Sequence, residues 1–539
     1  MTTRPKSLRA LEAGSRIQID ALELTLGSAR SLEAQGWWRQ GREASGAAHR
    51  VLELPADAVP PALVRAFEIP GVAAPCARQE SEGRALFVLR EAPGPSLEWL
   101  LRRREGLALW DVSLVESLVA LFQRVHDAGL FFGHLAPAMF SLAADGSLQL
   151  EEPDRLRLAG EASDRELNLF SAPEVAGGSN GGPRSDLFGL GMLAYGLLTG
   201  RLPAHRGDLP LPRVYRRSLP HGVATVLSRA SAASMQARHE SCRAFAEDLR
   251  ARTVPKGASP EGVSVGAASE IGRIKRQAMP VNQDAWYIGL DAASRRGILL
   301  VADGVSTADV GSGDLASGMV REAVRDSWEG AVGEILRTHK GPLPDEWAKA
   351  ALEAMLEDAN ARIYAFLKQP IFVGSLGPST HPPGSTAVLC ILDSDKLTVA
   401  NLGDSRLYLL REGALEQMTV DQDLRTELLQ AGRDPRALPD PGALGALTQS
   451  VGSFFFDPEG GITSRSLEPE VTEIYLRAGD RLLLCSDGVP DCLGENAEAL
   501  IARELALGDE PSEIAARLCR LADESLGADN ITALVLLAV

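Results

Sequence analysis

Cysteine is scarce in this chain of 539 residues and follows no metal-binding or disulfide pattern. The cysteines are scattered, and no two of them form a C-x-x-C pair. This spacing argues against both a zinc site and a disulfide framework, so we expect reduced, mostly buried thiols in a cytoplasmic protein. The six positions are Cys76, Cys242, Cys390, Cys485, Cys492 and Cys519.

Long apolar runs and an excess of basic residues are also missing. No run approaches the roughly 20 apolar residues that a membrane-spanning helix needs, and no apolar signal core follows Met1–Ser7. The chain has 55 Lys and Arg residues against 72 Asp and Glu residues, which gives a net charge of −17. This acidic balance argues against nucleic acid and anionic membranes as partners.

The length of the chain and a break in its composition predict its domains. A chain of 539 residues is expected to form two or three domains. Over residues 251–267, Pro, Gly and small residues replace the apolar periodicity found on both sides, which is typical of a linker. We therefore predict one domain over residues 1–250 and another over residues 268–539.

Two apolar stretches of the second half end in the same way, at an acid followed by glycine. Asp303 follows the run Gly297–Ala302, and Asp487 follows the run Arg481–Ser486. Each acid stands where a buried strand is predicted to leave the core. The glycine after it lets the backbone turn sharply and keeps its own carbonyl accessible.

Two further acids stand at the ends of predicted strands. Asp404 follows the run Leu397–Leu402, and Asp529 precedes the run Ile531–Leu537. One acid at such a place is commonly a solvated turn residue, but four predict a cluster at one mouth of a β core. The cluster would repel itself without a cation, and Mg²⁺ or Mn²⁺ accepts an all-oxygen ligand shell.

Three motifs of the first half occur in a recognisable order: His126–Phe140, Ser171–Val175 and Ser185–Pro203. They resemble the catalytic loop, the close of the activation segment and the buried helix after it in protein kinases. Arg238 stands where kinases carry the arginine that pairs with the equivalent of Glu174. The resemblance implies a bilobal fold, with a small β lobe followed by a larger helical lobe.

Departures from the kinase pattern predict that phosphoryl transfer is lost. His134 stands in place of the catalytic aspartate, Met139 in place of the metal-binding asparagine, and Glu152 in place of the metal-binding aspartate. Phosphoryl transfer depends on positioning and charge neutralisation by those residues. We predict a pseudokinase that is either an inert spacer or a sensing or docking module. Nucleotide binding stays open, since Glu152 could hold a metal ion.

Six motifs of the second half also follow one another in a recognisable order. They are Val281–Ala285, Val301–Gly304, Gly384–Val388, Asn401–Tyr408, Leu482–Gly488 and Asp529–Thr532. In this order they resemble the PP2C-type (PPM) metal-dependent protein phosphatases. The resemblance implies an α-β-β-α sandwich, with helices over residues 315–338 and 345–368 on an outer face. Together the two resemblances imply an α+β protein of two domains.

The phosphatase resemblance also implies a set of site residues. Asp303, Asp487 and Asp529 would be the catalytic centre, with Asp303 bridging two metal ions that activate a water to attack phosphorus. Asp404 would serve a third, weaker ion. The metal-binding residues implied are Asp284, Asp303, Gly304, Asp404, Asp487 and Asp529.

The sequence departs from the phosphatase pattern outside these acids. Gln283 replaces a glutamate, and Val305–Thr307 replaces a pair of glycines. The arginine that holds the substrate phosphate is not at its usual spacing. Arg276 is the candidate for it, with a solvated charge as the alternative, while Lys275 and Arg273 lie farther upstream.

Two hypotheses follow. The first is a Mg²⁺- or Mn²⁺-dependent phosphatase that hydrolyses phosphoserine and phosphothreonine in proteins, within a Ser/Thr kinase pathway, and is regulated or targeted by its kinase-like domain. The second is a signalling scaffold in which both domains are inactive, which the departure at Gln283 would favour.

Overall fold

The structure is a computed structural model, in which the chain forms two compact units, Met1–Val254 and Pro255–Val539. The residues that it describes are 11–31, 37–91, 94–103, 112–143, 145–161, 167–206, 209–217, 219–220, 222–253, 258–291, 293, 295–372, 376–457 and 461–539.

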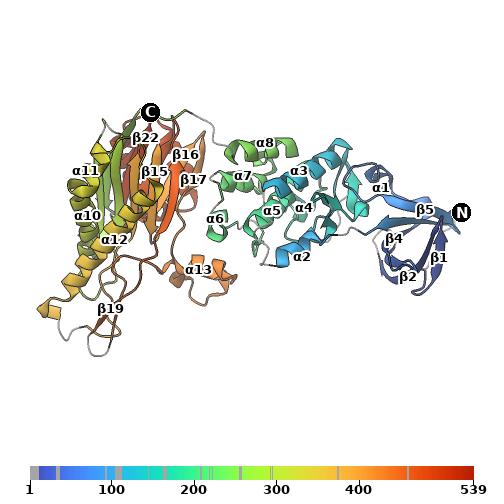
Figure 1. Cartoon of the computed structure of the whole chain (residues 1–539), viewed down its shortest axis with the longest axis horizontal. Coiled ribbons are helices and arrows are strands. Elements are labelled where there is room, and N and C mark those ends of the chain that lie inside the picture. Colours follow the sequence, from blue (N-terminus) through green and yellow to red (C-terminus); the bar gives the residue numbers. More distant parts are fainter. Residues whose placement is uncertain are drawn as a thin grey trace. The chain divides into compact units, whose positions relative to one another are not determined.

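The first unit begins with a six-stranded antiparallel sheet of order β1-β2-β3-β4-β6-β5, shown in blue in Figure 1. One face of the sheet carries Leu52, Leu54 and Phe87, which form a core with Leu63 of helix α1 (Pro61–Ala66). The strands are β1 (Arg16–Ile19), β2 (Leu22–Ser31), β3 (Trp37–Arg42), β4 (Ala48–Pro55), β5 (Pro75–Ser81) and β6 (Arg84–Arg90).

Helices dominate the rest of the first unit. Helix α3 (Val112–Asp127) shares one apolar core with α5 (Pro183–Thr199). Every residue of α5 from Ser185 onward is buried, as its nearly continuous apolar sequence predicts. The remaining elements are α2 (Leu97–Arg102), β7 (Leu130–Phe132), β8 (Phe140–Leu142), β9 (Leu148–Leu150), β10 (Leu156–Leu158), α4 (Pro173–Ala176), α6 (Pro212–Tyr215), α7 (Val223–Ala230) and α8 (Cys242–Thr253).

Two buried polar contacts hold this helical part together. Arg238 is only 1% exposed, and its guanidinium donates to both carboxylate oxygens of Glu174, at 2.7 and 2.8 Å. Asp186 Oδ2 lies 2.8 Å from His126 Nε2 and accepts the backbone N–H of Phe132 at 3.0 Å. The pair predicted between Glu174 and Arg238 is therefore present.

Glu152, which the kinase resemblance suggests as a metal-binding residue, lies among arginines. Its Oε1 is 3.5 Å from Arg30 Nη1 and 3.7 Å from Arg50 Nη2. Its Oε2 accepts from Arg155 Nε at 3.4 Å. The charge of Glu152 is thus compensated by side chains of its own unit.

The neighbouring Glu151 is buried without a hydrogen bond to its carboxylate. Neither oxygen has a hydrogen-bond partner among the described residues, but Oε2 forms an ion pair with Arg50 Nη1 at 3.6 Å. Burial raises the pKa of Glu151 to about 7. A raised pKa means that the neutral form is favoured in the folded state, so Glu151 stabilises the fold at low pH and loses that contribution as pH rises towards 7.

We expect Glu151→Gln to stabilise the first unit at pH 8, by roughly 1–2 kcal/mol, and to have much less effect at pH 5. Glutamine imitates the neutral carboxyl that burial prefers. Calorimetric melting of the full chain at both pH values measures the difference. Glu98→Gln is the control, because Glu98 is exposed and pairs with Arg102 on the surface; an equal gain at pH 5 and pH 8 would contradict the expectation.

The second unit contains two five-stranded antiparallel sheets, of order β11-β22-β21-β16-β17 and β12-β13-β14-β15-β20. The strands are β11 (Val263–Ile271), β12 (Asp284–Asp291), β13 (Arg296–Asp303), β14 (Ala387–Asp393), β15 (Lys396–Leu402), β16 (Arg406–Arg411), β17 (Ala414–Gln417), β20 (Glu470–Tyr475), β21 (Arg481–Cys485) and β22 (Asn530–Ala538). A separate hairpin joins β18 (Phe454–Phe456) and β19 (Ile462–Ser464).

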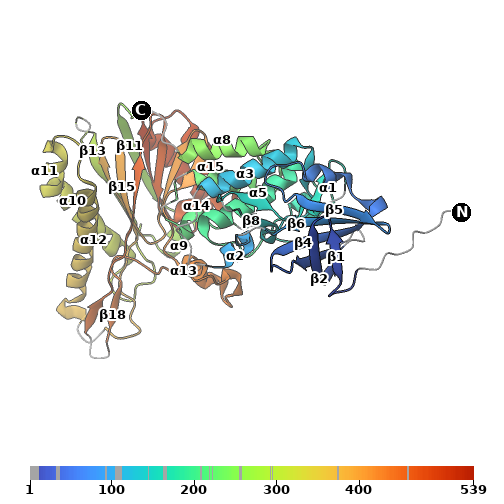
Figure 2. The same cartoon turned by 45° about the vertical axis from the view of Figure 1, so that its right-hand side comes forward.

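Helices cover the outer faces of both sheets. Helices α10 and α12 lie along the sheet that contains β13 and β15, as Figures 1 and 2 show. Helices α14, α15 and α16 pack on the sheet that contains β21 and β22. The helices of the unit are α9 (Lys275–Ala278), α10 (Gly313–Glu329), α11 (Ala331–Thr338), α12 (Asp345–Leu367), α13 (Leu424–Gln430), α14 (Gly488–Leu493), α15 (Ala497–Ala506) and α16 (Pro511–Ser525).

The core between the sheets explains why the strand sequences are continuously apolar. On β13, Leu299 and Val301 face the other sheet, while Ile298 and Leu300 face the helices. A strand buried on both faces has no polar alternation. The four layers are therefore the predicted α-β-β-α arrangement. The helical pattern over residues 315–338 forms two helices, α10 and α11, that meet at Gly330.

The predicted linker over 251–267 is shorter in the structure. Helix α8 continues to Thr253, residues 254–257 lie outside the described residues, and Val263 already begins β11. The small residues of this segment serve close packing: a β-carbon at Gly266 would stand 2.3 Å from the backbone nitrogen of Ser512 on α16. The small residue at this position therefore allows α16 to approach β11 closely.

Two expectations from composition concern the whole chain. All six cysteines are free, and five of them are buried, with Cys76 exposed. No helix among the described residues is long and apolar enough to cross a membrane.

Candidate metal centre

The predicted acids of the second unit begin with a pair on neighbouring strands. Asp284 of β12 and Asp303 of β13 are partners in the antiparallel register. The backbone of Asp303 is held by the Gly-Ser-Thr motif: its N–H donates to Thr386 Oγ1 at 3.0 Å, and its carbonyl accepts from Ser385 Oγ at 3.0 Å. Thr386 Oγ1 in turn lies 2.7 Å from Ser405 Oγ, beside Asp404.

Asp487 reaches the same place from the other sheet. It follows β21 and is the residue before α14. Ser486, just before it, donates from Oγ to Asp284 Oδ2 at 2.8 Å and accepts the N–H of Thr532 at 3.1 Å. The carboxyl groups of Asp303 and Asp487 lie close enough to affect each other's ionisation. The ends of two sheets therefore meet here.

Asp529 stands at the start of β22, with its carboxylate bound on two sides. Its Oδ1 accepts the N–H of Asn530 at 2.8 Å and a proton of Lys275 Nζ at 2.6 Å. Its backbone carbonyl accepts the N–H of Gly272 at 2.9 Å. Asp529 is therefore fixed by the segment that precedes β12.

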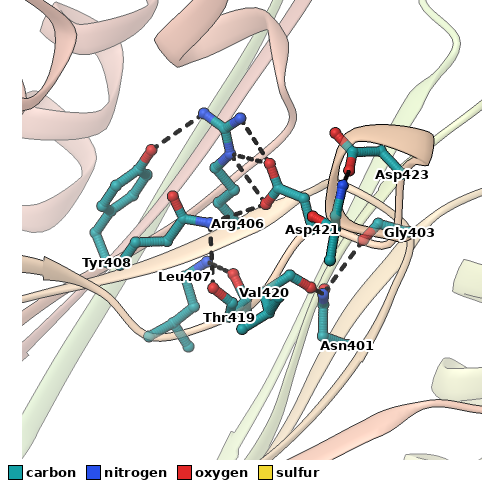
Figure 3. A network of polar contacts seen from close by, with 11 residues as sticks. Asn401, Gly403, Arg406, Leu407, Tyr408, Thr419, Val420, Asp421 and Asp423 are labelled. Atoms are coloured by element: carbon teal, nitrogen blue, oxygen red, sulfur yellow. Dashed lines mark hydrogen bonds and ion pairs between the residues drawn. The ribbon is translucent and has the colours of Figure 1, made fainter. Parts of the chain in front are cut away.

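Residues on both sides of Asp404 in the sequence belong to a polar network, which Figure 3 shows. Asn401 donates to the carbonyls of Gly403 and Val420, at 3.3 and 3.2 Å. On the other side, Arg406 donates to both oxygens of Asp421 through Nε, at 3.2 and 3.0 Å, and through Nη2 at 2.7 Å. The turn that carries Asp404 is thus held at both ends.

Gly304 occupies a place that no side chain fits. A β-carbon there would stand 2.2 Å from the carbonyl oxygen of Gly313 and 2.6 Å from that of Gln283. Its N–H donates to the Gln283 carbonyl at 3.0 Å. The glycine predicted as a carbonyl ligand is therefore required for close backbone packing beside Asp303.

The acids lie close enough to affect one another's ionisation. Burial, then Asp284 and Asp487, raise the pKa of Asp303 well above its usual range. Burial, with Asp487 nearby, raises the pKa of Asp404 to about 8. Burial also raises the pKa of Asp284 to about 7 and that of Asp487 to about 6. Without a cation among them, these carboxyl groups favour their neutral forms.

These residues suit a divalent ion in one specific respect. Asp284 Oδ1 and Asp487 Oδ1 are buried and have no hydrogen-bond partner among the described residues. A buried carboxylate oxygen without a donor is costly, and a cation would satisfy it. In the described part of the chain no three His, Cys, Asp or Glu side chains are already arranged as a metal-binding group. Among the acids, Asp529 contacts Lys275 and Asp284 contacts Ser486.

A cavity of about 720 Å³ opens beside the acids. Asp529 lines it, together with residues of β16, β17, α14 and α15. Arg406 and Tyr408 belong to its wall, and Asp491 and Glu495 give it further negative charge. The cavity gives Asp529 access to molecules from outside, whereas Asp303 and Asp487 do not line it.

Two adjacent cations, Arg276 and Lys275, make different contacts in the structure. Arg276 donates from Nη2 to the carbonyl of Ile271 at 2.6 Å, and its role towards a phosphate stays a prediction. Lys275, one residue earlier, contacts Asp529. The sequence alone does not distinguish Lys275 from Arg276, because the orientation of the short helix α9 decides which of the two side chains faces the acids. The sequence also gives no sign that Ser486 and Thr532 contact each other beside the acids, although both residues lie inside predicted motifs.

The comparisons with known sequences agree on one family. The family model of protein phosphatase 2C matches residues 342–428, which include Asp404. The serine/threonine protein phosphatase PstP of Mycobacterium tuberculosis is 31% identical over 189 residues, which are 34% of this chain and 32% of that protein. The serine/threonine phosphatase stp of Listeria monocytogenes is 26% identical over 238 residues, which are 44% of this chain and 83% of that protein.

The chain thus spans about a third of the length of the mycobacterial relative, at 32%. A crystal structure of the catalytic domain of PstP in complex with two manganese ions is 27% identical. It covers 51% of this chain and 97% of that one, with a TM-score of 0.37. The α-β-β-α architecture rests instead on the strand order and layers described above. Residues 342–428, in the second unit of the chain, are therefore similar to the protein phosphatase 2C family.

Proposed function

We propose that the second unit is a Mg²⁺- or Mn²⁺-dependent phosphatase that hydrolyses phosphoserine and phosphothreonine in proteins. The observation that carries the proposal is the meeting of Asp284, Asp303 and Asp487, from the ends of two sheets, with two buried oxygens that lack a donor. The match to protein phosphatase 2C and the phosphatase relatives support the same chemistry.

Each acid has a proposed part in this reaction. Asp303, Asp487 and Asp529 would hold two ions, with Asp284 and the Gly304 carbonyl beside them, and Asp404 would hold a third. Ions bound there would supply a polarised water and neutralise phosphoryl charge. Ser486 orients Asp284, and Thr386 orients Asp303, through the hydrogen bonds described above. Phosphorylated proteins are the proposed substrates, within a Ser/Thr kinase pathway.

The first unit is proposed to be a kinase-like domain without phosphoryl transfer, which regulates or targets the phosphatase. The bidentate Arg238–Glu174 pair supports the likeness. The arginines around Glu152 support the loss of catalysis, since they already neutralise the carboxylate that a metal ion would use. Incubation of the full chain with labelled ATP and Mg²⁺ is expected to give no autophosphorylation, and label that disappears in Glu152→Gln would contradict this.

The phosphatase proposal is tested by turnover of a phosphothreonine peptide and of p-nitrophenyl phosphate. We expect the full chain to be active with Mn²⁺ or Mg²⁺, inactive after EDTA, and active again after excess Mn²⁺. Binding of Mn²⁺ without turnover of peptides or phosphoproteins would instead favour the scaffold hypothesis. Turnover that persists in EDTA would contradict the dependence on metal ions.

A further inference from the structure

Asp284, Asp303, Asp404, Asp487 and Asp529 are called here the acid centre. One cation, Lys275, contacts this centre and has no role in the proposed reaction. Lys275 begins the short helix α9, and its Nζ donates to Asp529 Oδ1 at 2.6 Å. The lysine side chain is only 15% exposed. The Asp529 side chain is 39% exposed, so the ion pair is partly shielded from water. A partly shielded pair acts more strongly on its surroundings than a pair that is fully on the surface.

Two other side chains hold this ammonium group in place. Lys275 Nζ also donates to Ser306 Oγ at 3.0 Å, and Ser306 Oγ donates to Gln283 Oε1 at 2.8 Å. Gln283 is itself fixed, because it is 1% exposed and its backbone carbonyl accepts from Ser317 Oγ at 2.6 Å. These hydrogen bonds form one network that ends on Asp529.

This hydrogen-bond network explains the two departures from the phosphatase pattern together. Gln283 stands where many family members have glutamate, and Ser306 lies in the loop where a glycine pair is usual. Glutamine accepts the hydroxyl hydrogen bond without a negative charge that would draw Lys275 away from Asp529. The amide and the hydroxyl therefore act with the lysine as one unit.

We propose that Lys275 is a fixed positive charge that weakens the affinity of the acid centre for divalent metal ions, with Ser306 and Gln283 as its positioning residues. The inference rests on the proposed function, in which Asp529 is a metal ligand. An ion at Asp529 would share that carboxylate with the ammonium group and would be repelled by it. The lysine also compensates the acids when no ion is bound, so its two effects oppose each other.

The test is a calorimetric titration of Mn²⁺ into the full, EDTA-dialysed chain without substrate. We expect Lys275→Met, which keeps the length of the side chain and removes its charge, to bind Mn²⁺ about tenfold more tightly. Melting of the same proteins is a second measurement. The metal-free variant should melt at a lower temperature than the natural protein, and saturating Mn²⁺ should raise its melting temperature by more.

Matched variants separate this effect from a general loss of charge. Lys275→Arg keeps the charge and should bind Mn²⁺ nearly as the natural protein does. Arg276→Gln removes a neighbouring cation whose guanidinium donates to the Ile271 carbonyl, and should leave Mn²⁺ affinity unchanged. Ser306→Ala releases the ammonium group and should tighten Mn²⁺ binding in the same direction, by less.

Each outcome decides the inference. Equal or weaker Mn²⁺ binding by a folded Lys275→Met overturns it and leaves the proposed function intact. An equal gain in Arg276→Gln also overturns it, since the effect would then be unspecific. Absence of Mn²⁺ binding in the natural protein overturns the proposed function, and the inference with it.

Discussion

Asp303→Asn is expected to lower kcat for a phosphopeptide by about a thousandfold or more, with little change in stability. Asp303 ends a strand of one sheet, Asp487 of the other sheet helps to raise its pKa, and it is proposed to bridge two ions. Loss of several kcal/mol of charge stabilisation in the transition state corresponds to a factor of this size. Because burial and neighbouring acids raise the pKa of Asp303, its neutral form is already favoured without metal, and asparagine imitates that form.

Phosphopeptide turnover at saturating Mn²⁺, together with a melting curve, checks this result. Asp309→Asn is the matched control: Asp309 lies six residues further on and is an exposed acid that pairs with His381 at 2.8 Å. It should keep its activity within about twofold of the natural protein. An Asp303→Asn protein with normal turnover would show that the acid cluster is not the reaction centre.

Arg238→Met is expected to destabilise the first unit by about 3 kcal/mol or more, because breaking a buried pair leaves a carboxylate without its partner. The guanidinium of Arg238 also donates to the carbonyls of Ala232 and Arg184, at 2.8 and 3.0 Å, and the variant would lose these bonds too. For a unit of this size the melting temperature should fall by roughly 10 °C. Differential scanning calorimetry of the full chain measures the shift.

Arg250→Met is the control for Arg238→Met. Arg250 pairs with Glu116 on the surface, where its side chain is 60% exposed, so the free energy of unfolding should change by at most about 0.5 kcal/mol.

The destabilised Arg238→Met chain also tests whether the first unit regulates phosphatase activity. If phosphatase activity changes at the temperature where the first unit melts, that unit acts on the second. A melting temperature unchanged in Arg238→Met would contradict the structural importance of the pair.

Much of the second unit could be predicted because its signals are local and repeated. The run before Asp303 is long, apolar and buried on both faces, so a strand was the only economical interpretation. Asp487 and Asp529 gained their meaning from the same position at a strand end. The convergence of these acids follows from strand order, which the family resemblance implied and periodicity alone does not contain.

The errors and omissions arose where distance between segments decides the structure. The small residues around Gly266 resemble a linker, and only the approach of α16 shows their purpose. Lys275 and Arg276 are adjacent cations, and the turn of α9 sends one to Asp529 and the other to a backbone carbonyl. Propensity and spacing carry no information on which side of a short helix meets a neighbour.

The acids belong to different sheets, and this has a consequence for residues far from them. Asp303 is carried by one sheet, while Asp487 and Asp529 are carried by the other, so their spacing depends on how the sheets slide against each other. The interior layer that fixes this offset includes Leu299 and Leu484. A change of volume in that layer would shift the acids relative to one another, so turnover would respond to substitutions that touch neither acid nor substrate.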